Sequence, residues 1–174
     1  MSHRAPLLAV LAVAALAGCR EDIAAPAPWD LTEEAVSFFC QMNVLDHGGP
    51  KGQVHLDGMP APIFFAQVRD MVAYLKAPER DARILASYVS DMGAAPSWSD
   101  PGQGNWVPVD AAVFVVEAGV AGGMGAPEIV PFADPDAAAA FVARHGGRAV
   151  PLPEIPDDAA FGAVDPAATL ETPS

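Results

Sequence analysis

Short stretches of alternating apolar and polar residues predict most of the strands. Residues 53–57 alternate and run into Gly58-Met59-Pro60, a combination typical of a strand that ends in a turn. Residues 62–65 follow as a second short strand, so the two are expected to form a hairpin. Other stretches are rich in branched aliphatic residues, which favour strands. The complete set of expected strands is 53–57, 62–65, 84–89, 109–117, 129–133 and 148–150.

Helical periodicity appears twice. From Val68 to Leu75 the apolar residues recur three and four positions apart, and Pro78 ends the pattern. A second helix is expected to open at Asp134-Pro135-Asp136, with a capping carboxylate and a proline at the first helical position. Residues 137–145 form its body, and Gly146-Gly147 follows as a stop signal.

The two halves of the chain repeat the same order of elements. A shift of 67 residues aligns Ile63 with Val130 and Phe65-Ala66 with Phe132-Ala133. Each half then contains strand, strand, helix and strand, which predicts an α+β fold of two homologous ββαβ units in tandem. Chance similarity between alanine-rich amphipathic segments is the alternative explanation.

Composition at the two ends sets the expected boundaries. Pro26, Pro28 and several alanines occur in the stretch after Cys19, as in a tether. Beyond Pro151 the chain consists largely of Pro, Ala, Asp and Glu, with little to bury, which predicts disorder. The expected divisions are a signal peptide at 1–18, a tether at 19–32, a first ββαβ unit with a Cys-x-Met motif at 33–93, a second unit with its entry loop at 94–152, and a disordered tail at 153–174.

The amino terminus has the organisation of an export signal. Arg4 precedes an apolar run from Leu7 to Leu16 that is too short to cross a bilayer as a permanent helix. Residues 16–19, Leu-Ala-Gly-Cys, resemble a bacterial lipobox, which implies export, cleavage before Cys19 and lipid attachment to Cys19. An ordinary secretory signal cleaved near Ala17, or a retained anchor, remains the alternative.

The charge balance excludes some partners. The formal net charge is −13, and removal of residues 1–18 would leave eight Lys and Arg against twenty-two Asp and Glu. Nucleic-acid binding needs a basic surface, so we expect no nucleic-acid ligand. Adhesion to anionic lipid is disfavoured for the same reason, which leaves the lipid on Cys19 as the expected membrane attachment. An acidic surface suits a partner with a basic docking surface.

Cys40 is the only thiol expected to remain free once Cys19 carries lipid. The thioether of Met42 and the imidazole of His47 lie close to it in sequence, and Gly48-Gly49-Pro50 can turn the segment back on itself. Soft sulfur ligands select Cu(I), so these residues predict a copper site. The alternative is that Cys40 and Met42 are packing residues and His47 lies on a surface loop.

Short motifs follow one another along the chain in a specific order. The lipobox is followed by Cys40-Gln41-Met42 and then by Asp46-His47-Gly48-Gly49-Pro50-Lys51-Gly52-Gln53. The later motifs are Phe64-Phe65, Tyr88-Val89-Ser90-Asp91, Gly123-Met124-Gly125, Pro131-Phe132, Phe141 and His145-Gly146-Gly147. This succession resembles the NosL family, the accessory lipoproteins of nitrous oxide reductase. The resemblance covers about residues 16 to 150, and the order of the motifs is more specific than any single one.

This resemblance implies a copper chaperone and not an enzyme. It implies a periplasm-facing, membrane-anchored lipoprotein, expected at the outer membrane, that binds one Cu(I). The expected partners are nitrous oxide reductase and its membrane maturation complex. The matching motifs carry ligand candidacy to Cys40, Met42 and Met124. To these we add Met92, from its place beside Asp91, and His47 as a weaker candidate.

One departure from the family pattern affects the site. The family has paired acidic residues and then Gly-Cys where this chain has Ala66-Gln67 and Arg69-Asp70. No second thiol is therefore available at this position, which argues against a site with two thiolates.

Two other functions stay open at the level of sequence. One is a thiol-dependent enzyme that uses Cys40 and His47, although no third group that would orient such a pair is evident. The other is a periplasmic copper store or scaffold that binds the ion without delivering it.

Overall fold

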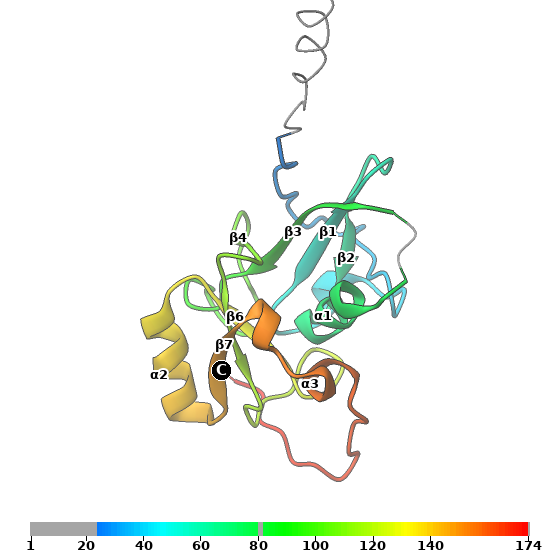
Figure 1. Ribbon diagram of the computed structural model, residues 1–174. Helices are drawn as coiled ribbons and strands as arrows, with labels where there is room; N and C mark the ends of the chain where they lie inside the picture. Colours follow the sequence, from blue (N-terminus) through cyan, green and yellow to red (C-terminus); the bar gives the residue numbers. More distant parts are fainter. Residues whose placement is uncertain (1–23, 80–81, 174) are drawn as a thin grey trace, which may run out of the picture.

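The structure is a computed structural model and describes residues 24–79 and 82–173. It contains two β-sheets with helices packed against them (Figure 1). The helices are α1 (Val68–Lys76), α2 (Pro135–His145) and α3 (Asp157–Phe161), with short 3-10 turns at Val44–Asp46 and Leu152–Glu154. The strands are β1 (Gly52–Leu56), β2 (Ile63–Phe65), β3 (Ile84–Ser90), β4 (Trp106–Pro108), β5 (Val113–Val116), β6 (Val130–Phe132) and β7 (Arg148–Pro151).

Both sheets follow the same plan. The first has the order β2-β1-β3-β4 and the second the order β6-β5-β7, with every pair of strands antiparallel. Helix α1 connects β2 to β3, and α2 connects β6 to β7. The predicted α+β class is confirmed, and the order strand, strand, helix, strand occurs twice. Strand β4 extends the first sheet at its edge.

The core joins the two sheets. Its larger cluster combines Val54 and Phe65 of the first sheet with Phe114 of the second and Met71 of α1. Helix α1 approaches β1 closely because Gly52 has no side chain; a Cβ there would collide with Met71. Burying each large apolar side chain contributes roughly 1.5–3 kcal/mol. The shared core therefore fixes the loops of one sheet relative to those of the other.

Helix α2 begins and ends where the sequence predicts. The carboxylate of Asp134 accepts a hydrogen bond from the Asp136 amide at 2.9 Å, and Pro135 is the first helical residue. Gly146 ends the helix with φ 74°, a left-handed conformation that glycine adopts without steric cost. These local signals place Phe141 on the buried side of the helix, against the second, smaller core cluster.

The region between the two sheets differs from the prediction in detail. The strand expected at 109–117 begins only at Val113, because Ala111 donates to the Pro108 carbonyl at 3.0 Å and makes a turn. The entry loop expected at the start of the second unit ends in β4, which pairs with β3. Strand propensity therefore predicted the stretch that contains β5 but not the residues at which the strand begins and ends.

The N-terminal segment is not a free tether over its described part. The amide of Trp29 donates to Gln53 Oε1 at 2.8 Å, and Gln53 Nε2 donates to the Trp29 carbonyl at 2.8 Å. The Tyr88 hydroxyl donates to the Pro26 carbonyl at 2.6 Å, and Leu31 is buried. The tether prediction is wrong for these residues because side chains of the first sheet hold the backbone of the segment. The predicted signal peptide and Cys19 lie outside the described residues.

The C-terminal segment is ordered where disorder was predicted. Ile155 and Ala160 are buried in the larger core cluster, and Lys76 of α1 forms an ion pair with Asp157 at 2.7 Å. Further on, His145 pairs with Glu171 at 3.0 Å, and the last described residues lie beside β7 and α2 (Figure 1). The prediction failed because a few apolar residues at suitable spacing suffice to anchor an otherwise polar segment.

The described residues include no helix that is both long and apolar enough to span a bilayer.

Candidate metal site

A tight turn carries both Cys40 and Met42. The amide of Ser37 donates to the Met42 carbonyl at 2.9 Å, and the amide of Gln41 donates to the Ser37 carbonyl at 2.9 Å. Cys40 is a free, partly buried cysteine, whereas Met42 is 42% exposed. The turn therefore presents a thiol and a thioether from one short stretch of fixed backbone.

The residue between them is conformationally strained. Gln41 has φ 58°, in the left-handed region that costs a residue with a Cβ roughly 1–2 kcal/mol. Its side-chain amide donates to the carbonyls of Phe38 at 2.7 Å and Ser37 at 3.3 Å, which stabilises the turn. Such strain persists where the surrounding structure holds it, and it concentrates at binding sites. Strain at Gln41 therefore indicates a specific role for the Cys40 turn (residues 37–42).

The Cys40 turn packs on the end of β2. The rings of Phe38 and Phe39 meet the Phe65 ring edge-on, with centroid distances of 6.0 and 5.5 Å. The amide of Ala66 donates to Ser37 Oγ at 3.3 Å, so a backbone group just beyond β2 holds the base of the turn. Aromatic contacts and this hydrogen bond together fix the turn to the first sheet.

His47 has one ring nitrogen available for a ligand. Its Nδ1 lies 3.0 Å from the Gly123 carbonyl, and because a carbonyl only accepts, Nδ1 carries the proton. The other nitrogen, Nε2, is buried without a hydrogen-bond partner. An imidazole that donates one N–H to a carbonyl and leaves the other nitrogen free is the usual arrangement of a metal-binding histidine. The geometry therefore suits His47 Nε2 to metal binding.

Met124 lies in a turn that presses on the loop of His47. A Cβ on Gly123 would lie 2.5 Å from the His47 Cβ and 2.7 Å from the Gly48 carbonyl oxygen, so this contact requires glycine. The Met124 amide donates to Gln67 Oε1 at 3.0 Å, while the Met124 side chain is 42% exposed. Like Met42, Met124 has a fixed backbone and an accessible thioether.

The junction Ala66-Gln67, between β2 and α1, connects all three of these loops. The Ala66 amide binds the base of the Cys40 turn, and Gln67 binds the Met124 amide. The third connection is made by Lys51, whose Nζ donates to the carbonyls of Ala66 at 3.1 Å and of His47 at 2.5 Å. The sequence-predicted residues Cys40, Met42, His47 and Met124 thus lie on loops that meet at one point of the fold.

Two buried ionisable groups lie beneath this junction. Burial lowers the pKa of Lys51 to about 8, against the opposing attraction of Glu128. Burial raises the pKa of Glu128 to about 8, although the carboxylate accepts hydrogen bonds from the amides of Arg69 and Ile129, each at 2.9 Å. At neutral pH Glu128 is therefore mostly a neutral acid and Lys51 mostly a cation.

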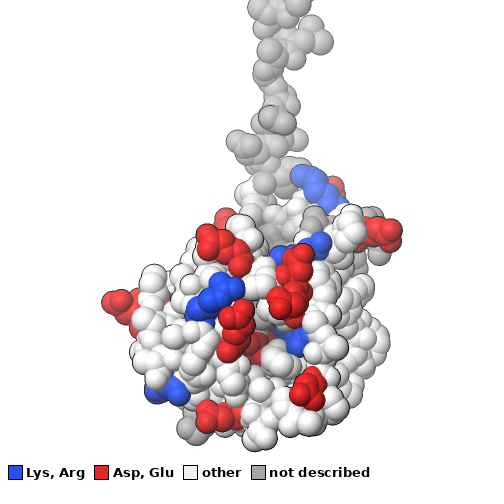
Figure 2. Space-filling view, turned by 60° about the horizontal axis from the view of Figure 1, so that its bottom comes forward, with Lys and Arg blue, Asp and Glu red and all other residues white. Residues whose placement is uncertain are grey.

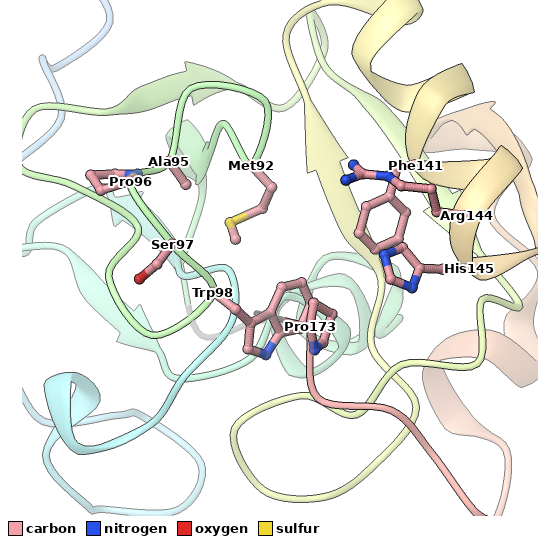
Figure 3. A pocket seen from close by; sticks show the side chains of 9 residues that line it. All are labelled: Met92, Ala95, Pro96, Ser97, Trp98, Phe141, Arg144, His145 and Pro173. Atoms are coloured by element: carbon pink, nitrogen blue, oxygen red, sulfur yellow. The ribbon is translucent and has the colours of Figure 1, made fainter.

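Met92 is placed elsewhere. It packs against the second core cluster, and its amide donates to the Pro131 carbonyl at 3.0 Å. Figure 3 shows its side chain in a cavity of about 340 Å³ that is lined also by Trp98, Phe141 and His145. These contacts favour the packing explanation for Met92 over a ligand role.

Charged groups are spread over the surface. On the face shown in Figure 2, acidic side chains lie scattered, and several have a basic side chain close by. Two exposed pairs recorded in the structure are Arg83 with Asp57 and Arg148 with Glu117, both at 3.2 Å. Exposed pairs of this kind contribute little to stability, typically under about 1 kcal/mol.

The donor set is that of a soft metal. Among residues 24–79 and 82–173, no three or more His, Cys, Asp and Glu side chains form a group that could hold a metal ion. A thiol and two thioethers, with one imidazole nitrogen, remain as candidate ligands, and sulfur ligands of this kind prefer Cu(I) to hard cations. In the same part of the chain no hydrogen bond joins Cys40 to His47, the contact that a thiol enzyme would use.

Sequence reasoning missed the residues that hold the loops. Lys51 and Gln53 were part of a recognised motif, but nothing in the motif indicates that both side chains are buried and bind backbone carbonyls. Gln67 and Glu128 stand in no motif at all. The one available signal is Glu128 directly before an apolar strand, where a carboxylate is unusual.

Comparison with known proteins finds relatives that are named as copper-binding proteins. The NosL family model matches residues 28–160. A curated protein of Achromobacter cycloclastes, named copper-binding lipoprotein NosL, is 51% identical over 153 residues, which cover 87% of this chain and 79% of the relative. A protein of the same name from Stutzerimonas stutzeri is 32% identical over 155 residues, covering 86% and 78%.

A solved structure agrees in fold as well. The crystal structure of the copper chaperone NosL from Shewanella denitrificans matches with a TM-score of 0.70 and 27% identity, covering 76% of this chain and 97% of that one. These are names of copper-binding proteins and of a chaperone, not of enzymes, as the sequence predicted. The resemblance seen in the motifs is thereby confirmed, and the chain belongs to the NosL family.

Proposed function

We propose that this protein binds one Cu(I) ion at the Cys40 turn and carries it to a partner protein. The names of its relatives, copper-binding lipoprotein and copper chaperone, support a copper-carrying role. The observation that carries the proposal is structural. The loops of Cys40, His47 and Met124 meet at Ala66-Gln67, so a thiol, thioethers and an imidazole come from neighbouring segments of fixed backbone.

In this proposal the ligands are the Cys40 thiolate and the thioethers of Met42 and Met124, with His47 Nε2 as a further ligand. Met92 is left out because its side chain packs against the second core cluster. A carrier must hold Cu(I) and also release it, which favours accessible ligands over a closed cage. The exposure of both thioethers, 42% for each, meets that requirement.

The oxidation state follows from the ligands. Thiolate and thioether sulfur stabilise Cu(I), whereas Cu(II) prefers nitrogen and oxygen donors. Cys40 is also the one free thiol in the described residues, and in an oxidising compartment a lone thiol is exposed to oxidation unless it is used. Bound Cu(I) would protect it.

An anaerobic titration against a competing Cu(I) chelator tests the ligand set. Cys40→Ser should lower the affinity by orders of magnitude, because a hydroxyl is a poor ligand for a soft ion. Met124→Leu removes a proposed ligand. Loss of a residue that only hydrogen-bonds a metal ligand already lowers metal affinity by roughly 10- to 100-fold, so Met124→Leu should lower the Cu(I) affinity by at least that factor. Met92→Leu is the matched control and should leave the affinity unchanged. Wild-type affinity in Cys40→Ser would refute the proposed site.

Delivery and membrane attachment are further parts of the proposal. Lipid on Cys19 would anchor the domain on the periplasmic side, with the outer membrane as the expected location. There it would serve nitrous oxide reductase and its membrane maturation complex. Anchoring raises the effective concentration of a carrier near a membrane-bound partner without any new contact. Mass spectrometry of membrane fractions should find acylated Cys19 at a new amino terminus; a product that begins elsewhere would contradict this.

Delivery is distinguished from storage in a denitrifying cell grown at limiting copper. Deletion of the protein should leave nitrous oxide reductase exported but poor in copper, while unrelated copper enzymes remain filled. A reductase with full copper content in the deletion strain would favour a store or scaffold. A parallel strain that carries Cys40→Ser controls for effects of removing the whole chain.

A further inference from the structure

Gln67 occupies an unusual position for a residue at the start of a helix. It is the N-cap of α1, yet its side chain makes no capping hydrogen bond. The side chain is buried and faces the Met124 turn instead, where Oε1 accepts the Met124 amide at 3.0 Å. Its Nε2 donates to Asp70 Oδ2 at 3.4 Å, so the amide group is held at both ends. A side-chain cap at a helix N-terminus typically contributes about 1 kcal/mol to stability, and α1 lacks this contribution from Gln67.

The Gln67 amide is also confined from the side of the Met124 turn. A Cβ on Gly122 would lie 2.7 Å from Gln67 Oε1 and would collide with the Glu128 carboxyl as well. Glu128 cannot move away easily, because the amides of Arg69 and Ile129 hold its other oxygen. The Gln67 side chain is therefore closely packed on this side, where its Oε1 accepts the Met124 amide.

Ala66, the residue before Gln67, contacts the Cys40 turn. The Ala66 amide donates to Ser37 Oγ in the Cys40 turn, and the Ala66 carbonyl accepts from Lys51 Nζ. Two adjacent residues thus hold the Cys40 turn on one side and the Met124 turn on the other. The position of one turn relative to the other is therefore linked through Ala66-Gln67.

We propose that Gln67 is a positioning residue for copper: by accepting the Met124 amide it holds the Met124 thioether at the distance from Cys40 that one Cu(I) requires. This rests on the proposed function. Without the bond the Met124 turn keeps its contact with His47 through the Gly123 carbonyl but loses its link to the Cys40 turn, and metal binding must then order the Met124 side of the turn. Gln67 itself does not touch the metal.

The test compares Cu(I) affinities of Gln67→Leu and wild type in the chelator titration. Leucine removes the acceptor while nearly keeping the size, so the affinity should fall by about tenfold, the effect of losing one hydrogen bond. Gln103→Leu is the control: this exposed glutamine donates to the Leu31 carbonyl at 3.4 Å and has no bond to the Met124 turn among the described residues, so the variant should bind as wild type does. X-ray absorption should show one fewer sulfur around copper in Gln67→Leu.

A double-mutant cycle separates positioning from a general structural effect. In a Met124→Leu background, Gln67→Leu should cause no further loss, since the thioether that it positions is absent. An equal, additive loss in that background would overturn the proposal. Cys40→Ser tests the copper site itself, whereas Gln67→Leu tests only the positioning role. If Cys40→Ser binds Cu(I) weakly and Gln67→Leu binds it as wild type does, the copper site stands and the positioning role of Gln67 is overturned.

Should Gln67→Leu fail to fold, amide hydrogen exchange of the wild-type protein gives the answer. The Met124 amide should exchange slowly in the metal-free protein and more slowly with Cu(I), because its hydrogen is bonded to Gln67. Rapid exchange of this amide in both states would overturn the proposal.

Discussion

Replacement of Glu128 by glutamine should change the pH dependence of stability. Burial raises the pKa of this carboxyl from 4.5 to about 8, so the folded protein keeps a proton that the unfolded chain releases. Between those pH values the folded state binds more protons, and the free energy of unfolding must therefore fall as the pH rises. Glu128→Gln removes the titrating group and keeps an oxygen that can accept the amides of Arg69 and Ile129.

The size of the effect follows from the two pKa values. Each pKa unit corresponds to about 1.4 kcal/mol, so ionised Glu128 costs the folded state up to about 5 kcal/mol. Lys51, which faces Glu128, has a pKa lowered to about 8 and is protonated in both states below that pH. Asp70 also faces it and has a pKa raised by burial, so it acts in the same direction as Glu128. Between pH 5 and 8 stability should fall by as much as about 1.4 kcal/mol per pH unit.

Urea unfolding of the metal-free protein at several pH values from 5 to 8 measures this slope. The slope should be much smaller in Glu128→Gln, and the variant should be the more stable protein above pH 8. Glu154→Gln, which changes an exposed carboxylate, is the matched control and should follow wild type. A Glu128→Gln profile parallel to that of wild type would refute the assignment of a buried, protonated Glu128.

Two further substitutions test the packing of the site and of the C-terminal segment. Gly123→Ala places a Cβ against His47, so it should destabilise the protein by about 1–3 kcal/mol and weaken Cu(I) binding. Gly125→Ala is the control, because Gly125 has open space around it. Its φ of 79° should cost about 1 kcal/mol of stability, and Cu(I) binding should stay intact. Chelator titration and urea unfolding of both variants check this, and equal binding would contradict it. Ile155→Ala should lower the free energy of unfolding, measured in urea, by about 2–5 kcal/mol because the Ile155 side chain is buried. Phe161→Ala should lower it much less, because Phe161 is exposed. A change near zero for Ile155→Ala would mean that the C-terminal segment is not packed.

The fold was predictable where local pattern and burial agree. Alternation and helical periodicity located α1, α2 and the strands of both sheets except β4, and the cap at Asp134 behaves as its chemistry predicts. Both ends of the described chain were misjudged for one reason. Composition reports the average of a segment, but a few contacts suffice to anchor it, such as those of Ile155 and Trp29.

The candidate site was predictable only for residues with distinctive chemistry. A thiol, thioethers and an imidazole can be recognised from the sequence, so Cys40, Met42 and Met124 could be named as candidate ligands. Gln67 and Lys51 act by binding backbone groups of distant segments, and the choice of those groups depends on tertiary structure alone. Met92 shows the converse: its chemistry resembles that of the other methionines, but its packing does not.

The division of labour at the candidate site would suit the proposed carrier, which must both hold and release a copper ion. The backbones of the ligand-bearing turns are fixed from beneath, through Ala66-Gln67 and the buried Lys51. The thioethers of Met42 and Met124 extend from these turns to solvent, each 42% exposed. A partner's ligands can therefore reach a bound ion without opening the core, and ligands could be exchanged one at a time while the turns keep their places. Affinity then depends on the buried hydrogen bonds, whereas access depends on the exposed side chains, so each can change by mutation without the other.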